Sequence, residues 1–255
     1  MTASALPVSE TFDGFGGARL ALHRVGKGAP VILLHGLFSD AAMNWVKFGH
    51  AQRIAARGYE VLMPDLRCHG DSAAPHDFAA YPDDVLVRDL EALVAHLDLS
   101  QYDLGGFSLG ARTCVRAVAG GLAPRRLVLG GMGLEGLTGW AERARFFIDV
   151  IDRFDSIERG DPAYFSMQFL KSQGVDRIAA RLLLNTMTDT DPAELDRFAM
   201  PTLVVCGDED RDNGSPTALA AAIPDATHVE VPGTHMGSVT KPDLGRAIAE
   251  WLGPA

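Results

Sequence analysis

The 255-residue chain contains few cysteines, and they are not arranged for cross-linking or metal binding. Its three cysteines, Cys68, Cys114 and Cys206, form no Cys-x-x-Cys pair and have no metal-site spacing, which argues against a disulfide scaffold and a zinc module. Cys114 and Cys206 lie in apolar stretches and are expected in the core, whereas Cys68 lies in a predicted loop and is the one cysteine to test for reactivity. We expect none of them to be a catalytic nucleophile.

Basic residues are also scarce relative to acidic ones, 23 against 33, which gives a net charge of −10. This charge argues against partners such as nucleic acid or an anionic membrane surface. No apolar run is long enough to span a bilayer, and residues 1–7 lack the charged and apolar regions of a signal peptide. We therefore expect a cytoplasmic protein with one domain, or one domain with an insertion, and the sequence indicates no particular oligomeric state.

Short apolar runs alternate with helical patterns along most of the chain. Runs typical of strands covered on both faces lie near residues 31–34, 60–64, 102–105, 126–131, 201–207 and 228–231. Helices with an apolar face are predicted over residues 44–57, 83–97, 111–118, 216–222 and 242–252. Strands separated by helices predict an α/β fold with a mostly parallel, doubly wound sheet.

Residues 8–26 have a different pattern, because apolar and polar residues alternate there around a glycine-rich turn at 13–17. This alternation predicts an N-terminal antiparallel hairpin. Leu20, Leu22 and Val25 are expected to face inward.

The alternation of strands and helices breaks between residues 133 and 196, where helix-like segments are rich in aromatic residues. We interpret residues 133–196 as a helical cap inserted into an α/β core formed by 1–132 and 197–255. Arg143 and Arg145 could bind a carboxylate substrate there, although a basic pair on a helix is more often solvated. Four aromatic residues could line an apolar acyl pocket or only pack the cap onto the core: Phe146, Phe147, Phe165 and Phe169.

The sequence Gly-Phe-Ser-Leu-Gly at residues 106–110 lies between a predicted strand and a predicted helix, which is the setting of a nucleophile elbow. Glycines on both sides leave room for a tight turn, so Ser108 would project from its tip. The N–H groups at the start of the helix would face developing negative charge there. A glycine-rich turn with an idle serine is the alternative, and the residues that follow decide between the two.

A serine hydroxyl needs a base to remove its proton, and the base needs a carboxylate to hold its tautomer. In this type of sheet, the acid and the base follow the serine on loops at the carboxyl ends of later strands. One later strand leads into Asp208 and Asp210, and the next leads into His235. We predict a triad of Ser108, His235 and Asp210. Asp208 is the alternative acid, but it is close enough to the strand end to serve only as a brace for the loop.

The alternative for His235 is a solvated loop histidine, and the alternative for Asp208 and Asp210 is that they only cap turns. The oxyanion hole should combine the N–H of Leu109, after the nucleophile, with that of Leu37, after the first buried strand. His35 precedes the serine, and we expect it to order this loop by hydrogen bonding. No cofactor and no metal are implied.

Five blocks of the sequence follow one another in the order of a known family: His35-Gly36, 65–72, 106–110, 207–210 and 233–235. Together they resemble the α/β-hydrolase superfamily, in its esterase and lipase-like branch with a small helical cap. The resemblance implies that the Asp-x-Arg-x-His-Gly-x-Ser loop is structural, so Arg67 and His69 are given no chemistry. Many members carry histidine at the position of Phe107, and we expect this departure to leave the triad untouched.

The resemblance implies a serine hydrolase that cleaves a small to medium carboxylic ester through an acyl-enzyme on Ser108, in the simplest case a carboxylesterase. Dehalogenases and epoxide hydrolases of this family use an aspartate nucleophile, which the serine disfavours. Carbon–carbon bond hydrolases, lactonases and acyltransferases use the same triad, and cap arginines facing Ser108 would favour cleavage of a ring-opened aromatic dienoate. A non-catalytic ligand receptor on the same scaffold is a further hypothesis, and an intact triad counts against it.

Overall fold

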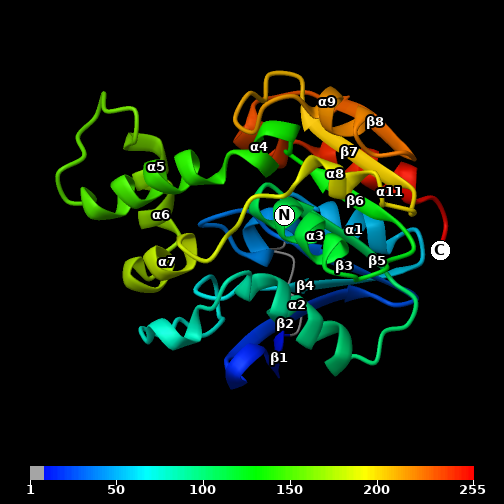
Figure 1. Cartoon of the computed structure of the whole chain (residues 1–255). Coiled ribbons are helices and arrows are strands. Elements are labelled where there is room, and N and C mark those ends of the chain that lie inside the picture. The colour runs from blue at the N-terminus through cyan, green and yellow to red at the C-terminus, as the bar shows by residue number, and fades with distance from the viewer. Residues whose placement is uncertain (1–8) are drawn as a thin grey trace, which may run out of the picture.

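The computed structural model describes residues 9–255, in which eight strands form one sheet flanked by helices (Figure 1). The strands are β1 (Ser9–Asp13), β2 (Arg19–Gly26), β3 (Ala29–Leu34), β4 (Tyr59–Pro64), β5 (Asp103–Phe107), β6 (Leu127–Gly130), β7 (Thr202–Gly207) and β8 (Ala226–Val231). Their order in the sheet is β1-β2-β4-β3-β5-β6-β7-β8. The pairs β1–β2 and β2–β4 are antiparallel and all other pairs are parallel, which confirms the predicted fold class.

The N-terminal strands form the predicted hairpin, with Asp13 opposite Arg19 at its closed end. A short 3₁₀ turn, Phe15–Gly17, connects them. Leu20 and Leu22 are buried, as the alternation predicts, whereas Val25 is half-buried. The hairpin extends the sheet beyond β4 by main-chain pairing.

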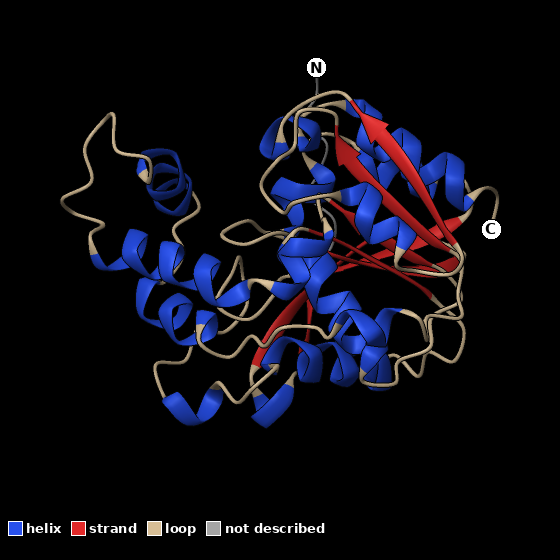
Figure 2. Cartoon of the chain, turned by 45° about the horizontal axis from the view of Figure 1, so that its top comes forward, coloured by secondary structure: helices blue, strands red, loops and turns tan. Residues whose placement is uncertain are grey.

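Helices cover both faces of the sheet (Figure 2). They are α1 (His50–Ala55), α2 (Val85–His96), α3 (Leu109–Ala119), α4 (Leu134–Thr138), α5 (Trp140–Asp152), α6 (Tyr164–Ser172), α7 (Arg177–Leu184), α8 (Pro192–Leu195), α9 (Pro216–Ala221), α10 (His235–Val239) and α11 (Pro242–Leu252). None of the helices within residues 9–255 is both long and apolar enough to cross a lipid bilayer.

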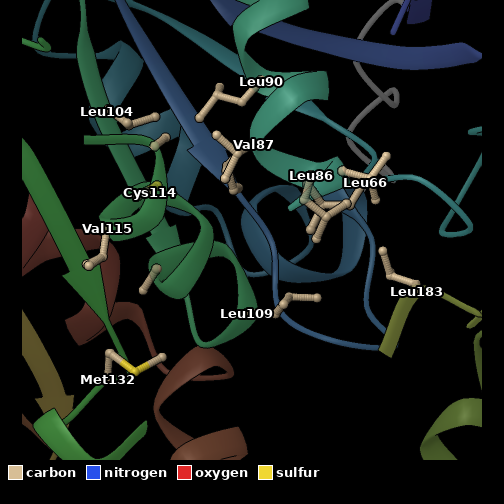
Figure 3. Packing of buried hydrophobic residues seen from close by; sticks show 14 of the residues in the cluster. Leu66, Leu86, Val87, Leu90, Leu104, Leu109, Cys114, Val115, Met132 and Leu183 are labelled. Carbon is tan, nitrogen blue, oxygen red and sulfur yellow. The ribbon is translucent and has the colours of Figure 1, made fainter. Parts of the chain in front are cut away.

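The position of β3 between two helix layers explains why its sequence is a continuous apolar run. Val31 and Leu33 point to one face, where they share a core cluster with residues of α1 and α11. Ile32 and Leu34 point to the other face and pack in the cluster that includes α2 and α3. Figure 3 shows part of this second cluster, in which side chains of α2 and α3 gather beside β5. Each such buried side chain stabilises the fold by about 1.5–3 kcal/mol.

The single helix predicted over residues 44–57 is wrong. The segment contains a π-helical turn, Ala42–Val46, and the short helix α1, with Gly49 just before α1. Gly49 has φ = 76°, a left-handed conformation that interrupts the helical path.

Residues 131–201, between β6 and β7, contain α4 to α8 and no strand, in agreement with the sequence pattern. Helices α5, α6 and α7 lie together to one side of the sheet (Figures 1 and 2). Leu137 of α4 and Leu183 of α7 belong to the same core cluster as α2 and α3, and a smaller cluster around Val150 lies among the helices themselves. The division into a cap at 133–196 and a core remains a prediction.

The path of the chain through the sheet reverses between β3 and β5. From β3 the chain continues to β4 on one side, and from β5 it continues through β6 and β7 to β8 on the other. Loops that leave two adjacent parallel strands at such a point separate, and ligands of α/β proteins bind in the resulting crevice. The loop after β3 contains Leu37, and β5 leads into Ser108.

Candidate active site

Ser108 lies at the turn between β5 and α3 in a conformation that few non-glycine residues adopt, with φ = 52° and ψ = −111°. The flanking glycines make this turn possible. A Cβ atom on Gly106 would lie 2.3 Å from the carbonyl carbon of Gly110, and one on Gly110 would lie 2.3 Å from the carbonyl oxygen of Leu34. The backbone is therefore packed too tightly on both sides of Ser108 for any larger residue, which is the arrangement expected of a nucleophile elbow.

The structure brings His235 together with Asp210 rather than with Asp208. His235 Nδ1 lies 2.8 Å from Asp210 Oδ2, and both side chains are buried. Burial of Asp210 opposes its ionisation, but the hydrogen bond and the charge of His235 outweigh it, so the pKa of Asp210 is lowered. Asp208 instead accepts the backbone N–H of Gly233 at 2.7 Å, which braces the loop before His235.

His235 is the first residue of the short helix α10, where the sequence predicts a loop. The side chain of Thr234 caps this helix by accepting the N–H of Gly237 at 3.2 Å. The ring of His235 extends over the end of β6 toward the elbow, since a Cβ on Gly131 would lie 3.0 Å from His235 Cε1 and 2.6 Å from Phe107 Cζ. His235 and Ser108 line one cavity. Within residues 9–255 they form no direct hydrogen bond, and such bonds often become short only when substrate is bound.

Phe107 has a closer relation to these residues than the sequence predicts. Its ring packs against that of His235, with the ring centres 5.0 Å apart and the planes inclined by 40°. The hydrogen bond between His235 and Asp210 is present beside this ring at 2.8 Å, and the expectation that the departure leaves the triad untouched stays a prediction. An aromatic ring beside the imidazole restricts the rotation of His235 and excludes water from that side.

Leu37 and Leu109 are the two residues predicted to form the oxyanion hole, and this role stays a prediction. Both line a small pocket with Ser108. Leu109 begins α3, so its N–H has no acceptor inside the helix. Within the described residues, neither this N–H nor that of Leu37 has a hydrogen-bond partner. Asn44, which the sequence analysis did not single out, holds the loop before Leu37 by accepting the N–H of Gly36 at 3.1 Å.

His35 orders the loop after β3, as expected. Its Nδ1 lies 2.8 Å from the carbonyl oxygen of Gly36 and its Nε2 accepts the N–H of Leu66 at 2.9 Å. Burial lowers the pKa of His35, which favours a neutral ring, and both ring nitrogens are hydrogen-bonded to backbone groups. His69 has the same role, because its Nε2 accepts the N–H of Phe38 at 3.0 Å and burial lowers its pKa to about 3.

Arg67 is also structural. Its guanidinium donates to both carboxylate oxygens of Asp89, at 2.9 and 2.6 Å, and to two backbone carbonyls. A fork of this kind fixes the 65–72 loop against α2. Cys68 lies in this loop but is buried, and burial raises the pKa of its thiol, so its selection as the cysteine to test is wrong.

Arg112 is a second residue that the sequence analysis did not single out. It lies one turn after Ser108 on α3, is buried, and donates to the carbonyl oxygens of Gly136 and Leu137 at 2.7 and 3.0 Å. Its guanidinium carbon is 5.0 Å from the ring centre of Trp140. Burial lowers the pKa of Arg112 to about 10, which leaves it charged at neutral pH. This side chain connects the elbow helix to α4 and α5.

The cavity that contains Ser108 and His235 has a volume of about 470 Å³ and a largely apolar wall. Of the four aromatic residues proposed to line an acyl pocket, Phe147, Phe165 and Phe169 line this cavity and Phe146 does not. Phe165 is 82 % exposed, so it forms part of the cavity rim. The two arginines separate: Arg143 lines the cavity, whereas Arg145 is exposed beside a different groove.

Two groups of histidine and acidic residues within residues 9–255 are close enough to bind a metal ion. One contains Asp210 and His235, and the other contains His23 and Asp65. In both groups one histidine nitrogen is already hydrogen-bonded to the aspartate, at 2.8 and 3.1 Å respectively. The proximity of histidine and aspartate in each group is therefore accounted for by this hydrogen bond, without a metal ion.

Comparison with known proteins places this geometry in a family. The chain is 28 % identical over 232 residues to the dihydrolipoyllysine-residue acetyltransferase component of the acetoin cleaving system of Pseudomonas putida, which covers 79 % of this chain and 59 % of that protein. It is 30 % identical over 154 residues to a 2-hydroxy-6-oxo-2,4-heptadienoate hydrolase of P. putida, covering 60 % of this chain and 51 % of that one. The chain thus spans less than two thirds of the length of both relatives.

An esterase from Thermogutta terrifontis, solved with malate bound, superposes with a TM-score of 0.72 at 26 % identity and covers 96 % of this chain and 98 % of its own. The sequence pattern of the Alpha/beta hydrolase family matches residues 31–244, which include Ser108, Asp210 and His235. The chain belongs to the alpha/beta hydrolase family.

Proposed function

We propose that this protein is a serine hydrolase that cleaves small to medium carboxylic esters through an acyl-enzyme on Ser108. The observation that carries the proposal is the elbow serine with φ = 52°, which faces the same cavity as a histidine bound at 2.8 Å to a buried aspartate. Family membership supports hydrolysis in general. The ester as substrate rests on the site and on the likeness to an esterase.

In the proposed first step, His235 Nε2 accepts the proton of Ser108 Oγ as that oxygen bonds to the ester carbonyl carbon. The negative charge that develops on the carbonyl oxygen is stabilised by the N–H groups of Leu37 and Leu109. The bond between the carbonyl carbon and the alcohol oxygen then breaks, and His235 donates its proton to the departing alkoxide. Asp210 holds the Nδ1–H of the imidazole throughout and favours its charged form.

The second step repeats this chemistry with water. His235 removes a proton from a water molecule, whose oxygen attacks the acyl carbon, and the bond to Ser108 Oγ breaks as the serine recovers its proton. The acid is released and the enzyme is unchanged. No metal or organic cofactor is required for any of these proton transfers.

The experiment that tests the proposal is intact-mass measurement after incubation with a fluorophosphonate. We expect one adduct on the wild type and none on Ser108→Ala, followed by turnover of an ester and lactone panel by the wild type alone. Ester turnover that persists undiminished in Ser108→Ala would contradict the assignment. No adduct on either protein, together with tight binding of a ligand without turnover, would support a non-catalytic receptor instead.

A second candidate is hydrolysis of a carbon–carbon bond, which the likeness to the 2-hydroxy-6-oxo-2,4-heptadienoate hydrolase favours. The same serine and histidine serve both reactions, so the acyl group and its partner decide between them. Turnover of a ring-opened aromatic dienoate faster than of every ester in the panel would select this candidate. Acyl transfer would be indicated if an added alcohol intercepts the acyl-enzyme more efficiently than water does.

A further inference from the structure

The cavity beside Ser108 has few charged residues in its wall, namely Lys47, Arg143 and Asp212. Lys47 and Asp212 are exposed, whereas Arg143 is half-buried. Arg143 also lines the smaller pocket that contains Ser108 and Leu109. Arg143 is therefore the charged side chain of this wall that lies deepest toward the nucleophile.

Arg143 is incompletely paired. Its Nη1 donates to the backbone carbonyl oxygen of Asp212, and its guanidinium carbon lies 5.8 Å from the ring centre of Phe147. The carboxylates of Asp212 and Asp210 are near enough to favour its charged form, but Arg143 forms no salt bridge with any carboxylate in residues 9–255. A guanidinium has five N–H donors, so most of its donors remain available.

Burying a cation without an ionic partner is costly, and burial does lower the pKa of Arg143. The planar fork of a guanidinium matches a carboxylate in two parallel hydrogen bonds, and such bonds are strong where water is excluded. The aromatic wall contributed by Phe147, Phe165 and Phe169 suits a carbon skeleton between two polar ends. An anionic ligand would complete the charge pairing that the protein leaves open.

We propose that Arg143 is a specificity-determining residue that binds a carboxylate carried by the substrate, so that the preferred esters of this site have an anionic end group. This inference rests on the serine-hydrolase function proposed above and adds the class of substrate. The scissile carbonyl lies at Ser108, and the carboxylate lies at Arg143 in the same cavity.

Arg145 provides a matched control on the same helix. Residues two apart on an α-helix do not share a face, and Arg145 is exposed beside a groove that includes Trp140 and Leu184. It has the same charge and the same chain length as Arg143, but it does not line the cavity of Ser108.

The experiment compares kcat/KM for two pairs of esters that differ only in an anionic group. The acyl-side pair is mono-para-nitrophenyl adipate and the corresponding para-nitrophenyl adipamate. The alcohol-side pair is para-acetoxybenzoate and para-acetoxybenzamide. Wild type, Arg143→Gln, Arg143→Lys and Arg145→Gln are measured with all four compounds.

In the wild type we expect the carboxylate of at least one pair to exceed its amide by about 10- to 100-fold, the range expected of a charge-assisted hydrogen bond. Arg143→Gln should abolish this ratio, Arg143→Lys should retain part of it, and Arg145→Gln should leave it unchanged. A wild type that prefers neither carboxylate overturns the proposal. Equal loss for both members of a pair in Arg143→Gln also overturns it, because Arg143 would then act by holding the Asp212 carbonyl.

These outcomes differ from those that would defeat the serine-hydrolase proposal. If the neutral esters are hydrolysed and Ser108 is labelled by fluorophosphonate, but no carboxylate is preferred, only the role of Arg143 fails. If the neutral esters are untouched and Ser108 is not labelled, the proposed function itself fails.

Discussion

Replacement of Gly110 by alanine tests how tightly the elbow is packed against β3. A Cβ at this position would lie 2.3 Å from the carbonyl oxygen of Leu34, 2.6 Å from its carbonyl carbon and 2.8 Å from the carbonyl oxygen of His35. Ordinary contacts of this kind are about 3.5 Å, so strand and helix must separate by roughly 1 Å. All three neighbours are backbone atoms, and no side-chain rotation can relieve the contact.

The energetic consequence can be bounded from both sides. Alanine is favoured over glycine within a helix by about 1 kcal/mol. Overpacking of a close contact costs about 1–3 kcal/mol, and a contact between two backbones is expected at the upper end. We expect Gly110→Ala to lower the free energy of unfolding by about 2 kcal/mol. A displacement of roughly 1 Å between Leu109 and the loop of Leu37 should also slow acylation by about 100-fold.

The assay is urea unfolding followed by tryptophan fluorescence, combined with the rate of fluorophosphonate labelling of Ser108. Gly120→Ala is the control, because Gly120 lies at the other end of α3 with φ = −75° and its Cβ would be 3.3 Å from the nearest atom. That variant should change stability by less than about 1 kcal/mol and label normally. If Gly110→Ala matches Gly120→Ala in both measurements, the close packing inferred for the elbow is refuted.

Four other substitutions test the surroundings of the site and of the sheet beside it. Asp210→Asn should lower kcat for the best ester by about 10³- to 10⁴-fold because the imidazole loses its tautomer partner, whereas Asp208→Asn should cost only a few-fold, and equal losses would contradict the assignment of the acid. Asn44→Ala leaves the buried backbone N–H of Gly36 unpaired, so it should lower the free energy of unfolding in urea by about 1–3 kcal/mol and slow fluorophosphonate labelling of Ser108. Labelling at the wild-type rate would contradict the role of Asn44 in holding the loop before Leu37. The hydrogen bond to Asp65 raises the pKa of His23 above 6.5, so this pair stabilises the fold fully below about pH 6.5 and loses its effect as pH rises through the folded pKa. His23→Gln should therefore destabilise by about 1–2 kcal/mol at pH 6 and by less at pH 9, and a loss that does not depend on pH would contradict this linkage.

Local pattern was sufficient to predict the sheet, because buried parallel strands need unbroken apolar runs. Each residue of β3 faces one of two helix layers, so Val31 to Leu34 are all apolar, and this is visible without knowing what covers them. Turn chemistry was equally local. The glycines at 106 and 110 are required by the path of the backbone itself, and they mark the elbow in the sequence.

The errors arose where a single backbone angle or a distant partner decides the structure. Gly49 is compatible with a helix in sequence, and only its left-handed conformation divides the 44–57 segment. Cys68 lies in a loop as predicted, but residues 65–69 of that loop are buried, and Arg67 in it pairs with Asp89, 22 positions later in the sequence. Loop position therefore did not imply exposure.

Two residues near the site were missed because their roles depend on contacts with other segments of the chain. Asn44 falls within a stretch whose spacing indicates a helix, and its function depends on Gly36, eight residues earlier. The signal that could have identified it is a polar residue among apolar neighbours that the helical pattern places inside. Arg112 gave no such signal, because Ser108, Thr113 and Arg116 give its side of α3 a polar pattern, although Arg112 itself is buried. A polar residue that the pattern places in the core, as at Asn44, indicates a hydrogen bond before its partner is known.

The negative charge of the whole protein does not conflict with an anionic substrate, because the two act over different distances. At physiological ionic strength the field of exposed charges falls off over about 8 Å, so most of the 33 acidic residues contribute little inside the cavity. Arg143 is half-buried in the cavity wall beside Phe147, where solvent screening is weaker than at the exposed surface. The proposed preference for a carboxylate therefore depends on one local contact rather than on the net charge, which is why Arg145, with the same charge two residues away, is the decisive control.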